Sequence, residues 1–121
     1  MEFKVQNLTT SQLKDRLKGA RPYMLVDVRE TDAFMKGHIP SASNMFDGEV
    51  MSMVKKLNKS TDIILYGPDN CIKNTTCSDA AEKFMKLGSK YVYTYDGGLK
   101  GWADGGNRID RSDCSDHKMT T

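Results

Sequence analysis

The sequence has few of the features that mark a secreted, membrane-spanning or nucleic-acid-binding protein. Its 121 residues include only three cysteines, and a count that is low and odd does not make a disulfide framework. No apolar run approaches the roughly 18 residues that a transmembrane helix needs, and the first residues lack the basic-then-apolar layout of a secretory signal. The formal net charge of +2 is too small to indicate binding to nucleic acid or to an anionic membrane. We therefore expect a cytoplasmic protein whose partners are neither nucleic acids nor membranes.

The chain does contain an alternation of apolar strands and amphipathic helices, within the length of one domain. The apolar runs predict strands at residues 3–5, 23–28, 62–66 and 91–95. Capping residues and helical periodicity predict a short helix after the cap-type residues 9–11, ending at Gly19. The same signals predict helices at residues 30–36, 50–57, 77–87 and 99–103. This order is typical of an α/β domain in which a parallel sheet lies between helices.

The domain is expected to occupy residues 1–104, followed by a polar tail at 105–121. The tail has almost no apolar residues beyond Ile109, Cys114 and Met119. Such a segment buries too little surface to offset the entropy of ordering it, so we expect it to be flexible.

Two cysteines lie between the strand at 62–66 and the following helix. Thr76 and Asp79 resemble a capping box, which would place Cys77 in the first helical turn and Cys71 in the loop before it. In parallel sheets ligands bind beyond the carboxyl ends of the strands. The helix dipole and the free N–H groups there lower a thiol pKa and can hold an anionic persulfide. The alternative is that both cysteines pack beneath the loop as small apolar residues.

Four further side chains have a candidate role around this loop. Asp27 and Arg29, at the end of a strand, are interpreted as an internal ion pair or loop anchor rather than as catalysts. His38 lies in a Gly-His-Ile-Pro turn and is expected to fix that turn by hydrogen bonding. Lys73, the only basic residue of the cysteine loop, either holds an anionic donor or is solvated.

A zinc site is the other chemistry that these residue types suggest. Its four ligands would be Cys71, Cys77, Cys114 and His117. Their spacing departs from that of common structural zinc sites, and two of them lie in the polar tail. We therefore expect neither a metal nor a cofactor.

Two segments resemble the signatures of rhodanese-like domains. The first is Asp27-Val28-Arg29-Glu30 with Phe34-x-x-Gly37-His38-Ile39-Pro40-Ser41-Ala42-x-Asn44, in which Ser41 replaces the usual glycine. The second is Tyr95-Asp96-Gly97-Gly98-Leu99-Lys100-Gly101-Trp102. The resemblance extends over roughly residues 3–104. It implies a doubly wound α/β domain whose central parallel sheet is flanked by helices on both faces.

The resemblance also implies sulfur transfer from thiosulfate or a persulfide donor to a thiol, cyanide or protein acceptor, through a cysteine persulfide. Counting back from Ala80-Ala81, Cys71 stands at the spacing of the family's nucleophile, and Cys77 is the second candidate. The expected cradle consists of Ile72, Lys73, Asn74, Thr75, Thr76 and Cys77. The loop is longer here than in typical family members. In those members the nucleophile directly follows the strand, at the position of Gly67. Family members often have an arginine five residues after the nucleophile, and Thr76 stands at that position here.

These departures leave other functions open. The domain can instead be a catalytically inactive module that binds a partner or senses redox state. A pair of loop thiols acting as a reductase predicts a disulfide between Cys71 and Cys77.

Overall fold

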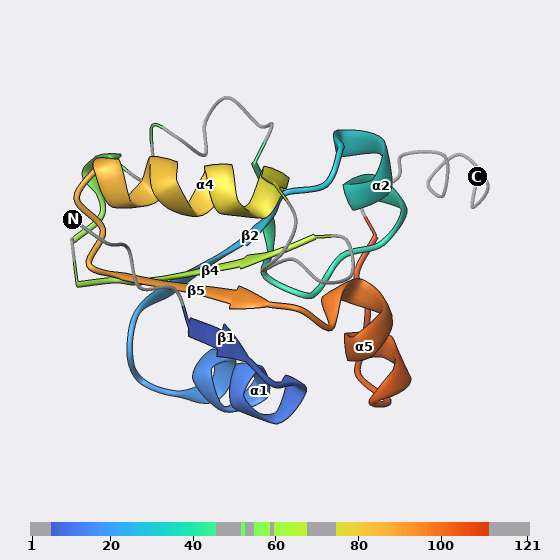
Figure 1. Cartoon of the computed structure of the whole chain (residues 1–121). Coiled ribbons are helices and arrows are strands. Elements are labelled where there is room, and N and C mark those ends of the chain that lie inside the picture. The colour runs from blue at the N-terminus through green and yellow to red at the C-terminus, as the bar shows by residue number, and fades with distance from the viewer. Residues whose placement is uncertain (1–5, 46–51, 53–54, 59, 68–74, 112–121) are drawn as a thin grey trace, which may run out of the picture.

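The computed structural model describes residues 6–45, 52, 55–58, 60–67 and 75–111. In this part of the chain five parallel strands form one sheet in the order β1-β5-β4-β2-β3 (Figure 1). The strands are β1 (Gln6–Leu8), β2 (Tyr23–Asp27), β3 (Ser43–Asn44), β4 (Asp62–Tyr66) and β5 (Tyr91–Tyr95). The helices are α1 (Thr10–Lys18), α2 (Thr31–Lys36), α4 (Thr75–Lys86) and α5 (Gly98–Asp104). This is the doubly wound α/β fold that the sequence predicted.

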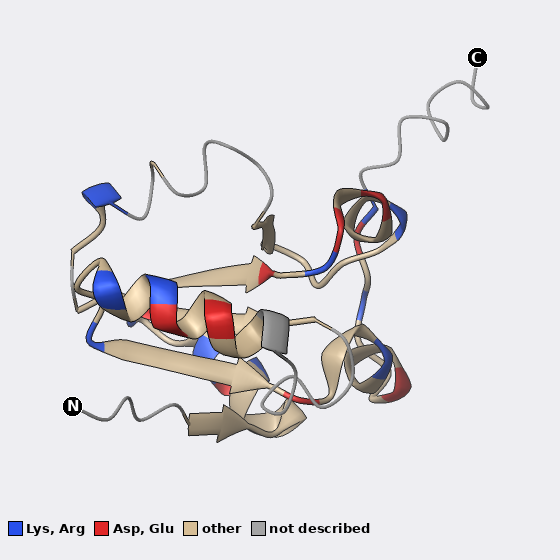
Figure 2. Cartoon of the chain, turned by 45° about the horizontal axis from the view of Figure 1, so that its top comes forward, with Lys and Arg blue, Asp and Glu red and all other residues tan. Residues whose placement is uncertain are grey.

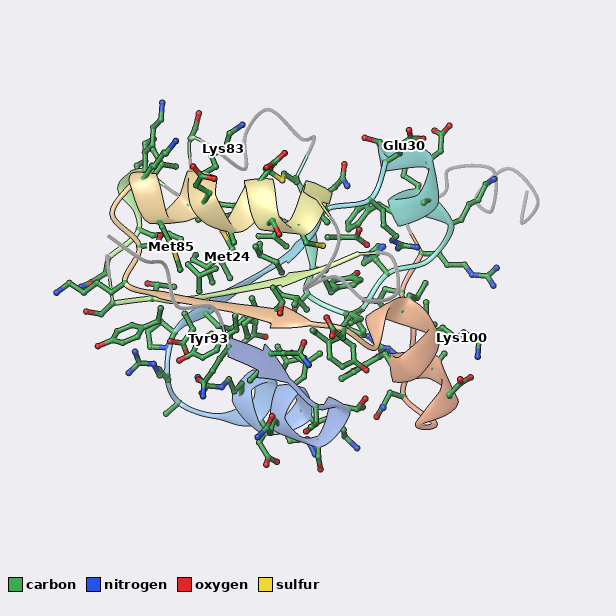
Figure 3. The ribbon with its side chains drawn as sticks, in the orientation of Figure 1. Met24, Glu30, Lys83, Met85, Tyr93 and Lys100 are labelled. Carbon is green, nitrogen blue, oxygen red and sulfur yellow. The ribbon has the colours of Figure 1, made fainter. Side chains whose placement is uncertain are left out.

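Each face of the sheet has its own core. On the α4 face, buried side chains of β2, β4 and β5 pack against Cys77, Ala80, Ala81 and Phe84. On the other face, Leu13 of α1 and Trp102 of α5 cover a second cluster from the same strands. Figure 3 shows Met24 directed towards α4 and Tyr93 directed towards α1. Because β4 is covered on both sides, all five of its residues are buried.

Local sequence signals explain where the helices begin and end. At the start of α1 the Thr9 side chain accepts a hydrogen bond from the Gln12 amide at 3.1 Å, and the Gln12 side chain accepts one from the Thr9 amide at 2.9 Å. This reciprocal pair is a capping box. After α4 the chain turns at Gly88, whose φ of 100° lies in the left-handed region that favours glycine.

Most predicted helices and strands are confirmed, but some of them begin or end at other residues than predicted. The strands at 62–66 and 91–95 have the predicted bounds. The first strand is at Gln6–Leu8, beyond the predicted segment 3–5, which lies outside the described residues. Strand β3 was not predicted, because two residues show no periodicity. Helix α4 begins at Thr75, so Thr76 is a residue of the helix rather than its cap. Half of the predicted helix 50–57 lies outside the described residues, and Ser52, Lys55 and Lys56 within it are helical.

Part of the predicted tail is hydrogen-bonded to the domain. Trp102 Nε1 donates to the Arg108 carbonyl at 2.7 Å. His38 and Asp110 exchange two backbone hydrogen bonds of 2.9 Å. Residues 105–111 therefore return across the end of α5, and residues 112–121 lie outside the described part of the chain. Within the described part, no helix has the length and apolar character needed to cross a bilayer.

Candidate functional site

The carboxyl ends of four strands meet at one edge of the sheet. Asp27 at the end of β2 is in register with Tyr66 of β4 and with Asn44 of β3. Tyr66 is in register with Tyr95 of β5. Because all these strands are parallel, their last residues and the loops that follow them share this edge. The segment that bears Cys71 leaves β4 here and leads into α4.

A buried ion pair anchors this edge. The Asp27 side chain is fully buried, and its Oδ2 lies 2.7 Å from Nη2 of Arg29. The same Nη2 donates to the Gly37 carbonyl at 2.6 Å, and Asp27 Oδ1 accepts the Arg29 amide at 2.9 Å. Burial lowers the pKa of Arg29, but the hydrogen bonds and charge of Asp27 outweigh burial and leave it raised. Arg29 therefore keeps its charge, and its contacts with Asp27 and with the Gly37 carbonyl tie the end of β2 to the turn at Gly37.

Tyr66 adds a buried hydroxyl to the same edge. Its Oη accepts the backbone N–H of Ile39 at 3.0 Å. Burial raises the pKa of Tyr66 above its ordinary value of 10.0, and the negative charge of Asp27 raises it further. The sequence identified Tyr66 only as a strand residue, because nothing local shows that its hydroxyl reaches a turn 27 positions away.

Asn44 is the other side chain whose role the sequence missed. Its Nδ2 donates to the carbonyl of Arg29 at 2.9 Å, and its Oδ1 accepts from the Thr31 hydroxyl at 2.9 Å. It therefore joins β3 to the start of α2. The sequence signal for this role was the position of Asn44 at the end of the first rhodanese-like segment.

The His38 side chain contacts the backbone just before its turn. Its Nδ1 lies 2.8 Å from the Phe34 carbonyl. Because a carbonyl only accepts, Nδ1 carries the proton. The ring stacks on Phe34 with centroids 4.0 Å apart. These two contacts hold the His38 ring against Phe34 and connect the turn to the end of α2.

Cys77 lies against the end of β4. Its side chain is fully buried, and it is disulfide-bonded. Both other cysteines, Cys71 and Cys114, lie outside the described residues. A Cβ atom placed on Gly67 would stand 3.6 Å from the Cys77 sulfur but only 2.6 Å from Cγ2 of Val28. The chain therefore has room for Cys77 beneath the first turn of α4 but none for a side chain at position 67.

Gly67→Ala is expected to lower the free energy of unfolding by about 1–3 kcal/mol, because its Cβ would overlap Val28 in a packed core. Urea unfolding measures the change. Gly19→Ala is the matched control: its Cβ would meet its nearest neighbour at 3.4 Å, in a backbone conformation open to any residue. The double variant Gly67→Ala/Val28→Ala should lose less stability than the sum of the single variants. Additive losses would contradict the overlap.

Tyr66→Phe is expected to cost about 1–3 kcal/mol of stability at pH 7, because it leaves the Ile39 N–H buried without its acceptor. The exposed Tyr91 supplies the control Tyr91→Phe, which should change stability by less than about 0.5 kcal/mol.

The same variant tests the raised pKa of Tyr66. Above pH 10 the unfolded chain can ionise this tyrosine but the folded chain cannot, so the unfolded state binds fewer protons and wild-type stability falls. The Tyr66→Phe variant lacks this loss. The stability gap between the two proteins should therefore narrow as the pH rises above 10, and a constant gap would contradict the assignment.

The remaining predicted site residues fall in two groups. Cys71, Ile72, Lys73 and Asn74 lie outside the described residues. Thr75 and Thr76 begin α4. No three His, Cys, Asp or Glu side chains within the described part of the chain are grouped as metal ligands would be. Cys114 and His117, which were also considered as zinc ligands, lie outside the described residues as well.

Comparison with known proteins relates the chain to a family. The family model of the rhodanese-like domain matches residues 9–104. Thiosulfate sulfurtransferase GlpE of Shewanella oneidensis is 24% identical over 97 residues, which cover 80% of this chain and 91% of GlpE. The uncharacterized protein YibN of Escherichia coli is 30% identical over 89 residues, 73% of this chain and 61% of YibN. The chain thus spans less than two thirds of YibN.

Solved structures agree. The Alr3790 protein from Anabaena superposes with a TM-score of 0.72 at 26% identity, over 94% of this chain and all of that chain. A thiosulfate sulfurtransferase from Pseudomonas aeruginosa gives a TM-score of 0.71 at 28% identity, over 88% of this chain and 20% of that one. With its parallel sheet, its two signatures and a family model that spans most of its length, the chain belongs to the rhodanese-like family.

Proposed function

We propose that the protein is a sulfurtransferase that carries a sulfane sulfur as a persulfide on Cys71. One observation carries the proposal: in a rhodanese-like domain, the segment between the carboxyl end of β4 and the N-terminus of α4 contains this cysteine. That is where a parallel α/β sheet offers a ligand both a helix N-terminus and a set of loop amides.

The reaction has two half-steps. The Cys71 thiolate attacks the outer sulfur of thiosulfate, the bond between the two sulfur atoms breaks, and sulfite leaves with the electron pair. The enzyme then holds a cysteine persulfide. A nucleophile such as cyanide or an acceptor thiolate attacks the outer sulfur of this persulfide, and the Cys71 thiolate leaves. Covalent catalysis thus divides one difficult transfer into two displacements.

Residues 72–77 would form the cradle of the persulfide, through backbone N–H groups that face its negative charge. Lys73 is the cation of this segment available to an anionic donor. The family's arginine is Thr76 here, which removes a fixed positive charge. We therefore propose that a persulfide donor, which carries less charge than the thiosulfate dianion, is used more efficiently than thiosulfate.

Two features of the described residues support Cys71 over its rivals. A side chain at position 67, where the family usually has its nucleophile, would overlap Val28, so this position does not suit a nucleophile here. Cys77 is fully buried within the core on the α4 face, whereas an attacking sulfur needs access to its donor. In the reduced protein Cys77 then serves as a resolving or bystander thiol.

A second candidate function is favoured by the disulfide at Cys77. If Cys71 is its partner, oxidation removes the nucleophile, and the domain acts as a redox-sensing or binding module rather than as an enzyme. Peptide mapping without reductant tests this pairing. A peptide pair joined through Cys71 and Cys77 supports the second candidate, and a linkage through Cys114 contradicts it.

Cyanide-dependent formation of thiocyanate distinguishes the two functions. The reduced protein, supplied with thiosulfate or with a persulfide donor, should turn over repeatedly if it is a sulfurtransferase. The Cys114→Ser variant should be as active as the wild type. The absence of turnover with either donor would refute the enzyme and leave the binding module.

A further inference from the structure

We propose that a groove between α1 and α5 binds an organic anion, with its acid group between Lys14 and Lys18 and its apolar body against Leu17, Tyr23 and Trp102. Both helices cover the same face of the sheet, opposite α4 (Figure 1). The inference does not depend on the proposed sulfur chemistry.

The groove is concave and mostly apolar. It encloses about 470 Å³, within the roughly 300–1,000 Å³ typical of small-molecule sites. Leu17, Tyr23, Pro40 and Trp102 contribute apolar surface to its lining. A few polar atoms stand among them, including the Tyr23 and Ser41 hydroxyls, which are 3.1 Å apart. Such a surface accepts a flat apolar body with a small number of polar contacts.

The rim of the groove is positively charged. Lys14, Lys18 and Arg108 line it, and among the described residues that line the groove none is acidic. Arg108 is already paired with Asp110 at 3.0 Å. Lys14 and Lys18 are four residues apart on α1, which places their side chains side by side where like charges repel. None of the ion pairs found within the described ranges includes either lysine.

The other basic residues near α1 behave differently. Arg16 and Arg21 both bind the buried Asp62, at 2.9 and 2.8 Å, and stack over Tyr93 and Tyr91. Their charges are therefore used within the fold. The two lysines of the groove contribute nothing comparable to it, and an anion seated between them would relieve their repulsion. One helical turn separates their Cβ atoms by about 5–6 Å, a spacing that suits a single acid group.

The wall of the groove is held in an unusual backbone conformation. Ser41 has a φ of 74°, in the left-handed region that residues with side chains rarely adopt. The family signature usually has glycine here. Serine at this position costs backbone energy, and strain of this kind is concentrated at ligand sites. The hydroxyl that serine adds is hydrogen-bonded to the Tyr23 hydroxyl, and both residues line the groove.

The probe for this proposal is 8-anilinonaphthalene-1-sulfonate, an aromatic anion that fluoresces on binding. Trp102 lines the groove and is the only tryptophan of the chain, so energy transfer from it reports a bound probe, and the lysine variants locate the binding site. At low ionic strength we expect saturable binding with energy transfer. The variant Lys14→Gln/Lys18→Gln should raise the dissociation constant about three- to tenfold, as exposed charge pairs allow.

A matched control is available on the opposite face. Lys83 and Lys86 are three residues apart on α4 and line a separate groove, but there Asp79 and Glu82 accompany them. Figure 2 shows both signs of charge on this helix, and Figure 3 shows Lys83 directed away from the sheet. Lys83→Gln/Lys86→Gln changes the net charge equally and should alter the dissociation constant less than about twofold.

The neutral analogue N-phenyl-1-naphthylamine should bind more weakly and with the same affinity to wild type and to both double variants. Equal weakening of sulfonate binding by both double variants, binding without energy transfer from Trp102, or no binding at all would overturn the proposal.

Discussion

Asp27→Ala is expected to lower the free energy of unfolding by about 3–5 kcal/mol. The Asp27 carboxylate is fully buried, and the side chain of its partner Arg29 is only 19% exposed. Removing the carboxylate leaves a guanidinium in the interior with the Gly37 carbonyl and Tyr66 as its neighbours but no opposite charge, and it removes the acceptor of the Arg29 amide. The loss reflects the charge left behind rather than the net strength of the pair.

Urea unfolding followed by Trp102 fluorescence measures this loss, because Trp102 is buried in the core on the α1 face. Glu82→Ala is the control, since it removes an exposed pair with Lys86 on α4. Its cost should be about 0.3–0.5 kcal/mol. Similar losses in the two variants would show that the Asp27 pair does not anchor the edge of the sheet.

Cys71→Ser is expected to lower sulfur-transfer turnover by more than about a thousandfold, to the background of the assay, because the nucleophile is lost. Cys77→Ala should retain turnover if Cys77 is a bystander or resolving thiol. Because Cys77 is fully buried, its variant is assayed at a temperature at which circular dichroism shows it folded. The reverse ranking of the two variants would assign the nucleophile to Cys77.

The parts of the fold that the sequence predicted well are those that depend on burial alone. Strand β4 is covered on both faces, and its continuous apolar run is visible without knowing its neighbours. Strand β3 depends instead on its pairing with Val26 and Asp27, so it has no pattern of its own. The beginning of α4 was misplaced by two residues because capping signals in a Thr-rich segment are degenerate.

The candidate site shows the same division. Asp27 and Arg29 are two residues apart at the end of a strand, so their interaction could be inferred from position. The contacts of Tyr66 with Ile39 and of Asn44 with Thr31 join different elements. Such pairs follow from how the strands assemble, which no local pattern records. The lack of space at Gly67, set by Val28, is likewise a property of packing.

The most direct test of the central claim is the mass of the intact protein after the reduced chain has been incubated with thiosulfate or a persulfide donor and freed of excess donor. The account predicts a gain of one sulfur atom, lost on addition of cyanide, absent in Cys71→Ser and present in Cys77→Ala and Cys114→Ser. No gain with either donor, or a gain that persists in Cys71→Ser, would contradict it.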